Sequence, residues 1–244
     1  WEYNFQKYIY LYVKYFIASN GMNATLATLL HSAQLLAPAG TGTTSLNTIM
    51  SRFSKTRQPH DHLRRIQPKL RGNYVISIRD PVERLVSGWK YRTMSTRSHR
   101  PWVSAASVGD FIEAFLDASH PQHIESQRVY WNSVMRPLPP AAGVVVQFGD
   151  PFLVSQVDYL RNYDPTIHHV LVVCTEELSW LSYHLNNASV HRNRHDQSST
   201  PIKEHLVQAV YNIMYPRDTA LYRAYCGVGA QGPHLLEPSM KLSF

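Results

Sequence analysis

The sequence predicts an α/β domain in which a mostly parallel sheet is flanked by helices. Short apolar runs rich in β-branched residues alternate along the chain with segments whose apolar residues recur at helical spacing. Repeated strand and helix units of this kind are typical of a parallel sheet covered by helices. The chain has 244 residues, of which 44% are hydrophobic and 17% are charged. We therefore expect one globular domain over residues 1–244 rather than a disordered chain.

The first strand and helix of this pattern enclose a loop of small residues. Residues 33–37 form an apolar run, and the helix after them has an apolar face made by Leu46, Ile49, Met50 and Phe53. The loop between them contains Gly40, Thr41, Gly42, Thr43, Thr44 and Ser45. Small residues let backbone N–H groups approach an anion, and the helix N-terminus adds partial positive charge. The loop predicts phosphate binding, although similar loops also occur in ordinary strand-to-helix turns.

The second strand leads directly into a helix through an arginine. Residues 74–78 form an apolar run typical of a buried parallel strand. Asp80 is expected to cap a helix that begins at Pro81, and Glu83 stands at capping-box spacing. Arg79 is then held at the carboxyl end of a strand, where open α/β sheets bind their ligands.

Arg79 and Ser87 together offer polar groups that suit a phosphate. Ser87 lies two turns into the expected helix. A guanidinium fork and a hydroxyl are well matched to a terminal phosphate monoester. The alternative is that Arg79 only forms an ion pair with Asp80 or Glu83.

Two further strands are expected later in the chain. They cover residues 144–148 and 170–174, and a helix through Phe152, Val157 and Leu160 is expected between them. Cys174 ends the last of these strands and is expected to be a buried thiol. Cys226 is the other cysteine, and two cysteines define neither a disulfide framework nor a redox compartment.

The segment that runs from the second strand through Arg79-Asp80-Pro81 to Ser87 resembles the 3′-phosphate motif of sulfotransferases that use 3′-phosphoadenosine 5′-phosphosulfate (PAPS). It is most similar to the Golgi carbohydrate, or glycosaminoglycan, branch. Residues 35–46 resemble the 5′-phosphosulfate loop of the same family. The resemblance covers roughly residues 33–226, which leaves a helical lead-in over residues 1–32 and a tail over residues 227–244.

This resemblance implies a P-loop-like three-layer fold and a defined donor site. Arg79 and Ser87 would bind the 3′-phosphate of PAPS, and the small-residue loop at residues 40–45 would bind its phosphosulfate. The activity implied is transfer of a sulfuryl group from PAPS to a hydroxyl, and no metal is expected. The implied location is the Golgi lumen, and the sequence leaves a cytoplasmic location open.

The loop departs from the family pattern at one position. The family has a lysine that contacts the leaving group, and the aligned residue here is Gly40, or Ala39 if the loop is one residue longer. Losing a cation aimed at developing charge typically costs about 3 kcal/mol of transition-state stabilisation. The nearest cations in the sequence are Arg52, Lys55 and Lys90.

The absent lysine keeps two alternatives open. The first is a non-catalytic relative that retains donor binding or binds a polyanion. The second is a P-loop nucleotide phosphotransferase, which the lack of a Gly-Lys-Ser/Thr sequence disfavours and which magnesium dependence would reveal.

The expected general base lies between the two phosphate motifs. Residues 58–68 contain His60, Asp61 and His62. His62, followed by Leu63 and later Pro68, resembles the His-Leu-Pro segment that carries the base in many family members. Histidine titrates near neutral pH and suits proton removal from a hydroxyl. We expect His62 to be the base, with His60 and then Asp61 as alternatives, although a loop histidine is often only a surface residue.

The acceptor site is expected near residues 120–131, where the resemblance implies a segment that faces the acceptor. His123 and Gln127 are four residues apart and would share one helix face. Tyr130 and Trp131 suit stacking on a sugar ring or packing in the core, and the core is favoured for aromatic residues at helical spacing.

The net charge of +7 is concentrated around these motifs. Thirteen of the 24 lysines and arginines lie in residues 52–100, against three acidic residues. Such a region attracts a polyanionic donor and suits an acidic acceptor. A solvated basic surface or a nucleic-acid patch would have the same composition. We expect the acceptor to be a hydroxyl-bearing carbohydrate, and we expect no nucleic-acid partner.

The first residues give no sign of a membrane span. Residues 3–17 are aromatic but are interrupted by Lys7 and Lys14, and they are too few to cross a bilayer. Membrane attachment is expected only through an N-terminal anchor outside this sequence. Glycosylation sequons begin at Asn23 and Asn187 and favour the secretory pathway.

Overall fold

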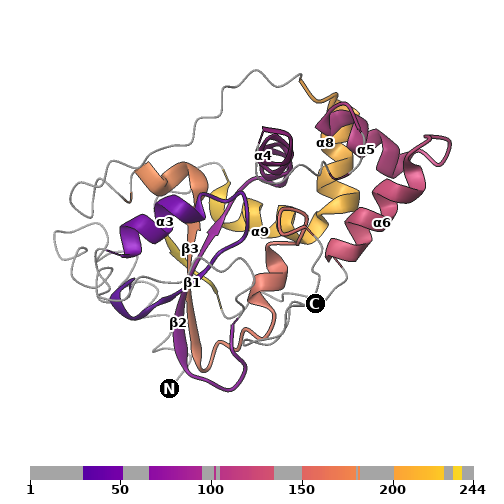
Figure 1. Cartoon of the computed structure of the whole chain (residues 1–244). Coiled ribbons are helices and arrows are strands. Elements are labelled where there is room, and N and C mark those ends of the chain that lie inside the picture. Colours follow the sequence, from indigo (N-terminus) through magenta and orange to yellow (C-terminus); the bar gives the residue numbers. More distant parts are fainter. Residues whose placement is uncertain are drawn as a thin grey trace.

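The computed structural model describes residues 30–51, 66–94, 102, 105–134, 150–179, 181, 201–227 and 233–237. Three sequence predictions fall outside these ranges: most of the helical lead-in, the strand at residues 144–148, and the segment with the candidate bases His60, Asp61 and His62. The described residues form an α/β structure with a mostly parallel four-stranded sheet flanked by helices, as expected (Figure 1).

The sheet has the order β1-β2-β3-β4. The three parallel strands are β1 (Gln34–Leu36), β2 (Gly72–Ile78) and β3 (His168–Cys174), and β4 (His234–Leu235) is antiparallel to β3. Leu36 is paired with Ile76, and Ile78 is paired with Cys174. The carboxyl ends of β2 and β3 therefore lie side by side, with the end of β1 two residues behind them.

The two faces of the sheet are covered by different elements, because alternate residues of a strand point to opposite faces. One face packs on the short 3₁₀ helix η1 (Val157–Leu160) and on α9 (Pro216–Cys226), through Leu36, Ile76, Val172 and their neighbours. The other face packs on α3 (Thr43–Met50), through Leu35, Val75, Leu171 and their neighbours. Figure 1 shows α3 and α9 on opposite sides of the strands, which gives three layers.

A separate helical layer lies beside the sheet. It contains α4 (Pro81–Met94), α5 (Val108–Leu116), α6 (His123–Val134), α8 (Glu204–Ala209) and the π-helical turn η3 (Val210–Met214). Its core includes Trp89, Trp102, Phe111 and Leu206. Within the described ranges, no helix combines the length and the apolar character needed to cross a bilayer.

One helix prediction is wrong in its extent. The helix expected through Phe152, Val157 and Leu160 is a turn followed by η1, because the backbone N–H of Val157 donates to the carboxylate of Asp218. Later in the chain, η3 and α9 are separate elements, because Pro216 has no N–H to continue the preceding helix and begins α9 instead.

The prediction of a buried Cys174 thiol is also wrong. Cys174 forms a disulfide with Cys226, which joins the end of β3 to the end of α9. The packing of α9 on the sheet brings the two Cα atoms to 5.7 Å, within the range that a disulfide spans. The sequence separation of 52 residues gave no sign of this proximity.

Candidate functional site

The loop between β1 and α3 has a backbone that favours glycine at two positions. Gly40 and Gly42 have φ angles of 79° and 72°, in the left-handed region that other residues rarely adopt. A Cβ atom on Gly42 would also lie 2.5 Å from the side chain of Leu178. Gly42 is the N-cap residue of α3 and has no side chain to accept a hydrogen bond from the first turn. The loop thus presents backbone N–H groups of the kind that bind anions.

Hydroxyl groups fix this loop to the ends of β2 and β3. The Thr41 Oγ1 atom donates to the carbonyl of Pro38 at 2.7 Å and lies 2.9 Å from the Ser77 hydroxyl of β2. The Thr175 hydroxyl, just after β3, lies 3.0 Å from the carbonyl of Thr41 and 2.9 Å from that of Ile78. The loop therefore has a fixed position at the carboxyl edge of the sheet.

The side chains predicted to bind the donor divide into two groups within this loop. Thr41 and Thr43 are buried, and the Thr41 hydroxyl is held by the Pro38 carbonyl and the Ser77 hydroxyl. Thr44 is exposed and Ser45 is half-buried, both in the first turn of α3. Ligand contacts from this loop are therefore left to its backbone and to the first turn of α3.

The structure brings Arg79 to this loop, as the two motifs together predict. The Arg79 Nη1 atom donates to the carbonyl of Gly40 at 3.3 Å across 39 residues of sequence. Its Nε atom also forms an ion pair with Glu83 at 3.1 Å, and its side chain is 26% exposed. The contact with Glu83 is the one expected if Arg79 had only a structural role. The structure therefore contains the ion pair expected for a structural role and also places the Arg79 side chain against the glycine loop.

The start of α4 confirms one cap and corrects another. The Asp80 Oδ1 atom accepts from the backbone N–H groups of Val82 at 2.9 Å and Glu83 at 3.1 Å, so Asp80 is the predicted N-cap. The Glu83 carboxylate, expected to complete a capping box, pairs with Arg79 instead. Ser87 is half-buried one turn beyond Glu83, on the same face of α4.

Further ionisable groups lie at the same edge of the sheet. Glu176 follows β3 and accepts a hydrogen bond from the Tyr222 hydroxyl of α9 at 3.3 Å. Burial raises the pKa of the Glu176 carboxyl, with a smaller contribution in the same direction from the negative charge of Glu83. Tyr211 donates to Asp80 at 2.7 Å, and burial together with this hydrogen bond raises the pKa of Tyr211. The Arg79 guanidinium therefore contacts one carboxylate, that of Glu83, and interacts electrostatically with a second, that of Glu176.

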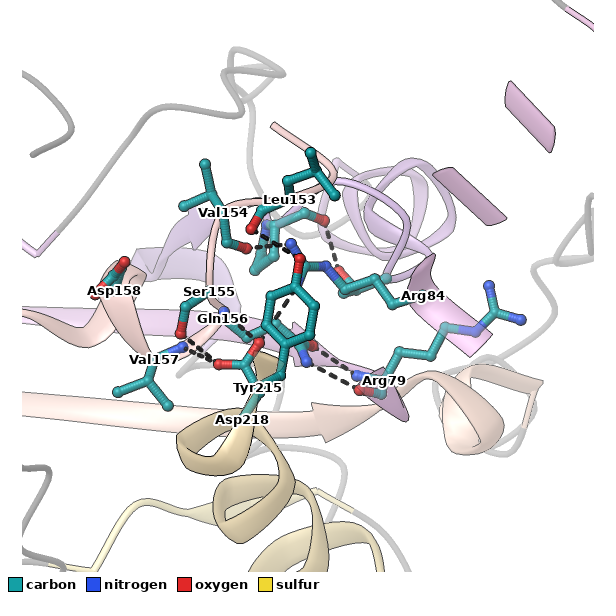
Figure 2. Close-up of polar contacts among 12 residues, drawn as sticks. Arg79, Arg84, Leu153, Val154, Ser155, Gln156, Val157, Asp158, Tyr215 and Asp218 are labelled. Atoms are coloured by element: carbon teal, nitrogen blue, oxygen red, sulfur yellow. Dashed lines mark hydrogen bonds and ion pairs between the residues drawn. The ribbon is translucent and has the colours of Figure 1, made fainter. Parts of the chain in front are cut away.

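A buried ion pair lies beneath the loop. Arg84 is 1% exposed, and its Nε atom donates to the carbonyl of Ala39 at 3.1 Å. Its Nη2 atom donates to the carbonyl of Val154, and its Nη1 atom lies 3.2 Å from a carboxylate oxygen of Asp218 (Figure 2). Arg84 thus joins the phosphate-loop candidate to α9 and to the turn before η1.

Asp218 is the centre of this network. Besides Arg84, its carboxylate accepts from the Ser155 hydroxyl and from the backbone N–H groups of Gln156 at 2.8 Å and Val157 at 3.1 Å. The side chain of Gln156 in turn bonds to the backbone of Arg79 (Figure 2). Sequence reasoning missed Arg84, Gln156 and Asp218, because only tertiary contacts show that these polar side chains are buried.

The predicted acceptor residues lie elsewhere in the fold. His123 Nδ1 is 3.0 Å from the carbonyl of Ala114, and Gln127 Nε2 donates to the carbonyl of Phe115 at 2.7 Å, so both contact the end of α5. Figure 1 shows α6 on the far side of the helical layer from α3. Tyr130 is buried in the core, as favoured, and Trp131 is 42% exposed. These side chains are not brought to the loop.

Among the described residues, no cluster of three or more His, Cys, Asp or Glu side chains is arranged to hold a metal ion. Comparisons of the chain with protein-family models, with curated proteins and with solved structures find no match.

Proposed function

We propose that this protein is a PAPS-dependent sulfotransferase with a P-loop-like fold, which transfers a sulfuryl group to a hydroxyl of a carbohydrate. The observation that carries the proposal is the contact between Arg79 Nη1 and the Gly40 carbonyl. It joins the two motifs that resemble the family's donor site at the carboxyl edge of a parallel sheet, where ligands of α/β folds bind.

In this proposal the donor lies across the loop and the start of α4. The phosphosulfate is bound by backbone N–H groups of residues 40–45 and by the N-terminus of α3. The 3′-phosphate is bound by Arg79 and Ser87. Arg79 exchanges its partner Glu83 for the phosphate, which carries more charge and accepts two parallel N–H bonds from a guanidinium.

Two arginines lie beside the position of the missing lysine. Arg79 contacts the carbonyl of Gly40, and Arg84 contacts that of Ala39, the two positions where the loop lysine would align. Arg84 is paired with Asp218, and Arg79 is assigned to the 3′-phosphate. Stabilisation of the leaving 5′-phosphate is therefore assigned to the backbone N–H groups of the loop and to the N-terminus of α3.

The acceptor hydroxyl loses its proton to a base as its oxygen bonds to sulfur and the bridging P–O–S oxygen leaves with 3′,5′-adenosine bisphosphate. His62 is the proposed base, with His60 and Asp61 as alternatives from the same segment. His123 and Gln127 remain proposed acceptor contacts, and they would have to exchange their bonds to α5 for bonds to the sugar.

The disulfide supports a location in the secretory pathway. Disulfides persist in oxidising compartments and are rare in the cytosol. The Cys174–Cys226 bond, together with the two sequons, therefore favours the Golgi lumen that the family resemblance implies.

A non-catalytic anion-binding protein is the second candidate function. It is favoured by the departure at Gly40 and by the ion pair that Glu83 forms with Arg79. Such a protein would bind the donor or another polyanion without turnover. It differs from an enzyme in the fate of bound PAPS, which would remain intact in the presence of any acceptor.

Calorimetric titration of 3′,5′-adenosine bisphosphate, with 5′-AMP and ATP for comparison, tests the donor site. We expect binding that requires the 3′-phosphate. Arg79→Ala should weaken it by about 10- to 100-fold, the value of a charge-assisted hydrogen-bonded contact. Arg128→Ala removes an exposed arginine of α6 and is the matched control, with unchanged binding. A preference for ATP with strict magnesium dependence would refute the proposal in favour of a nucleotide phosphotransferase.

Turnover is tested separately with PAPS and a panel of carbohydrate acceptors. His62→Ala should bind 3′,5′-adenosine bisphosphate like the wild type and should lose sulfuryl transfer. Normal turnover by this variant would assign the base to another residue, and His60 and Asp61 would be substituted next. Intact PAPS with every acceptor, despite tight donor binding, would favour the non-catalytic function.

A further inference from the structure

The backbone of Arg79 is held by a side chain rather than by a strand. Arg79 is one residue beyond β2, whose last paired residue is Ile78. The Gln156 Oε1 atom accepts from the Arg79 N–H at 2.8 Å, and the Gln156 Nε2 atom donates to the Arg79 carbonyl at 2.9 Å. One carboxamide thus makes both bonds that a residue on a neighbouring strand would make. The Gln156 side chain therefore continues the hydrogen bonding of the sheet by one residue, Arg79, which carries the guanidinium.

Gln156 is itself rigidly placed. It has no exposed surface, and its backbone N–H donates to Asp218 at 2.8 Å. The two oxygens of Asp218 accept from four donors, one of which is Arg84. Since Arg84 also donates to the Ala39 carbonyl, one buried carboxylate is linked to both halves of the anion site. Figure 2 shows these links converging on Asp218.

We propose that Gln156 is a positioning residue for the anion site, which fixes Arg79 relative to the glycine loop while Asp218 holds Gln156 and Arg84 in common. This inference rests on the proposed binding of the donor's 3′-phosphate by Arg79. An anion that is bound at both its ends requires a constant distance between the two binding groups. A site of this kind gains affinity when its first contacts are held by a second layer of hydrogen bonds.

A positioning role and a purely structural role make different predictions for ligand selectivity. Loss of the Gln156 carboxamide frees the Arg79 backbone, so that the contact with the 3′-phosphate weakens while contacts of the loop with the 5′-phosphate remain. The preference for 3′,5′-adenosine bisphosphate over 5′-AMP should then fall. A residue that only stabilises the fold would lower the amount of folded protein and leave this preference unchanged.

The test is a double-mutant cycle with Gln156→Met and Arg79→Ala, read by calorimetric titration of both nucleotides. Methionine has nearly the length of glutamine and cannot make either bond to Arg79. We expect Gln156→Met to weaken the binding of 3′,5′-adenosine bisphosphate by roughly tenfold, which is the value of the lost hydrogen bonds. The binding of 5′-AMP should be weakened much less. In the Arg79→Ala background, Gln156→Met should have little further effect, because both substitutions remove the same contact.

Tyr163→Phe is the control, since it deletes a half-buried side-chain bond to a backbone carbonyl, that of Leu236, and Tyr163 lies against His168 at the opposite end of β3 from the loop. It should leave the nucleotide preference unchanged. If Gln156→Met does not fold, Gln156→Asn keeps an amide in the buried position but is one methylene too short to bond both groups of Arg79, and the same loss of preference is expected.

Two kinds of result, one in the variants and one in the wild type, would overturn the inference. A folded Gln156 variant that keeps the wild-type preference, or effects that add fully in the cycle, would show that Gln156 does not act through Arg79. Absence of any preference for the 3′-phosphate in the wild type would overturn the proposed donor site and this inference with it. The two failures are distinguishable, because only the second appears in the wild-type protein.

Discussion

Asp218→Asn tests the reasoning about the buried network most directly. The side chains of Arg84 and Asp218 are 1% and 0% exposed, so neither charge has solvent to replace its partner. Asparagine has nearly the same shape as aspartate but presents one acceptor oxygen and one NH₂ donor in place of two oxygens. In either orientation, the NH₂ group faces two donors that the carboxylate satisfied.

The magnitude follows from the loss of one member of a buried pair. Removing one partner of such a pair typically costs about 3 to 5 kcal/mol, because the other charge stays buried without compensation. For a domain of this size, that loss lowers the melting temperature by on the order of 10 °C. The free energy of unfolding is measured by urea titration with tryptophan fluorescence, which also shows from the slope whether the unfolding remains comparable to that of wild type.

Glu113→Gln is the matched control, since it makes the same chemical change in an exposed ion pair. Glu113 lies 2.7 Å from Lys203, and these side chains are 36% and 67% exposed. The control should cost less than about 1 kcal/mol. A loss for Asp218→Asn no larger than that of the control would refute the assignment of Asp218 as the centre of a stabilising network.

Three further predictions concern other parts of the fold. His168→Leu should cost about 2 kcal/mol, because both ring nitrogens of this buried histidine bond to backbone groups, and equilibrium unfolding that matches wild type would contradict this. Burial raises the pKa of Glu176, so the folded protein binds this proton more tightly than the unfolded chain does. Its ionisation therefore lowers stability as the pH rises from the ordinary value of 4.5 through the raised pKa. Glu176→Gln should gain stability relative to wild type over that interval, and melting temperatures that differ equally at all pH values would contradict this. Reduction of the Cys174–Cys226 disulfide, which spans 52 residues of sequence, should cost about 2 to 4 kcal/mol. A Cys174→Ala/Cys226→Ala variant should be equally destabilised and should not respond to reductant, as calorimetry in the presence and absence of dithiothreitol will show.

The contact between Arg79 and the glycine loop was predictable from sequence, although Arg79 and Gly40 are 39 residues apart. Each motif ends a strand, and the carboxyl ends of parallel strands meet at one edge of a sheet. The Asp80 cap was predictable for a simpler reason, since a capping side chain bonds to N–H groups only two and three residues away.

The partner of Glu83 was not predictable in the same way. The spacing of Glu83 from Asp80 allows a capping box, and the spacing of Glu83 from Arg79 allows an ion pair. The structure contains the ion pair, because Arg79 continues the line of β2 and its side chain turns back toward the first turn of α4. The capping box and the ion pair both require the Glu83 side chain, and the path of the backbone after β2 determines which of them forms.

The sequence by itself determined the three parallel strands β1, β2 and β3, the helix that follows each motif, and the shared edge at which Arg79 meets the loop. These features depend on the alternation of apolar residues and on hydrogen bonds between neighbours in the chain, both of which are local. Only the tertiary structure decided that Cys174 pairs with Cys226 and that Gln156 and Asp218 hold the site from beneath. Those contacts join residues 52 to 77 positions apart, and they form because α9 and the turn before η1 pack against the sheet with polar side chains directed inward, away from water.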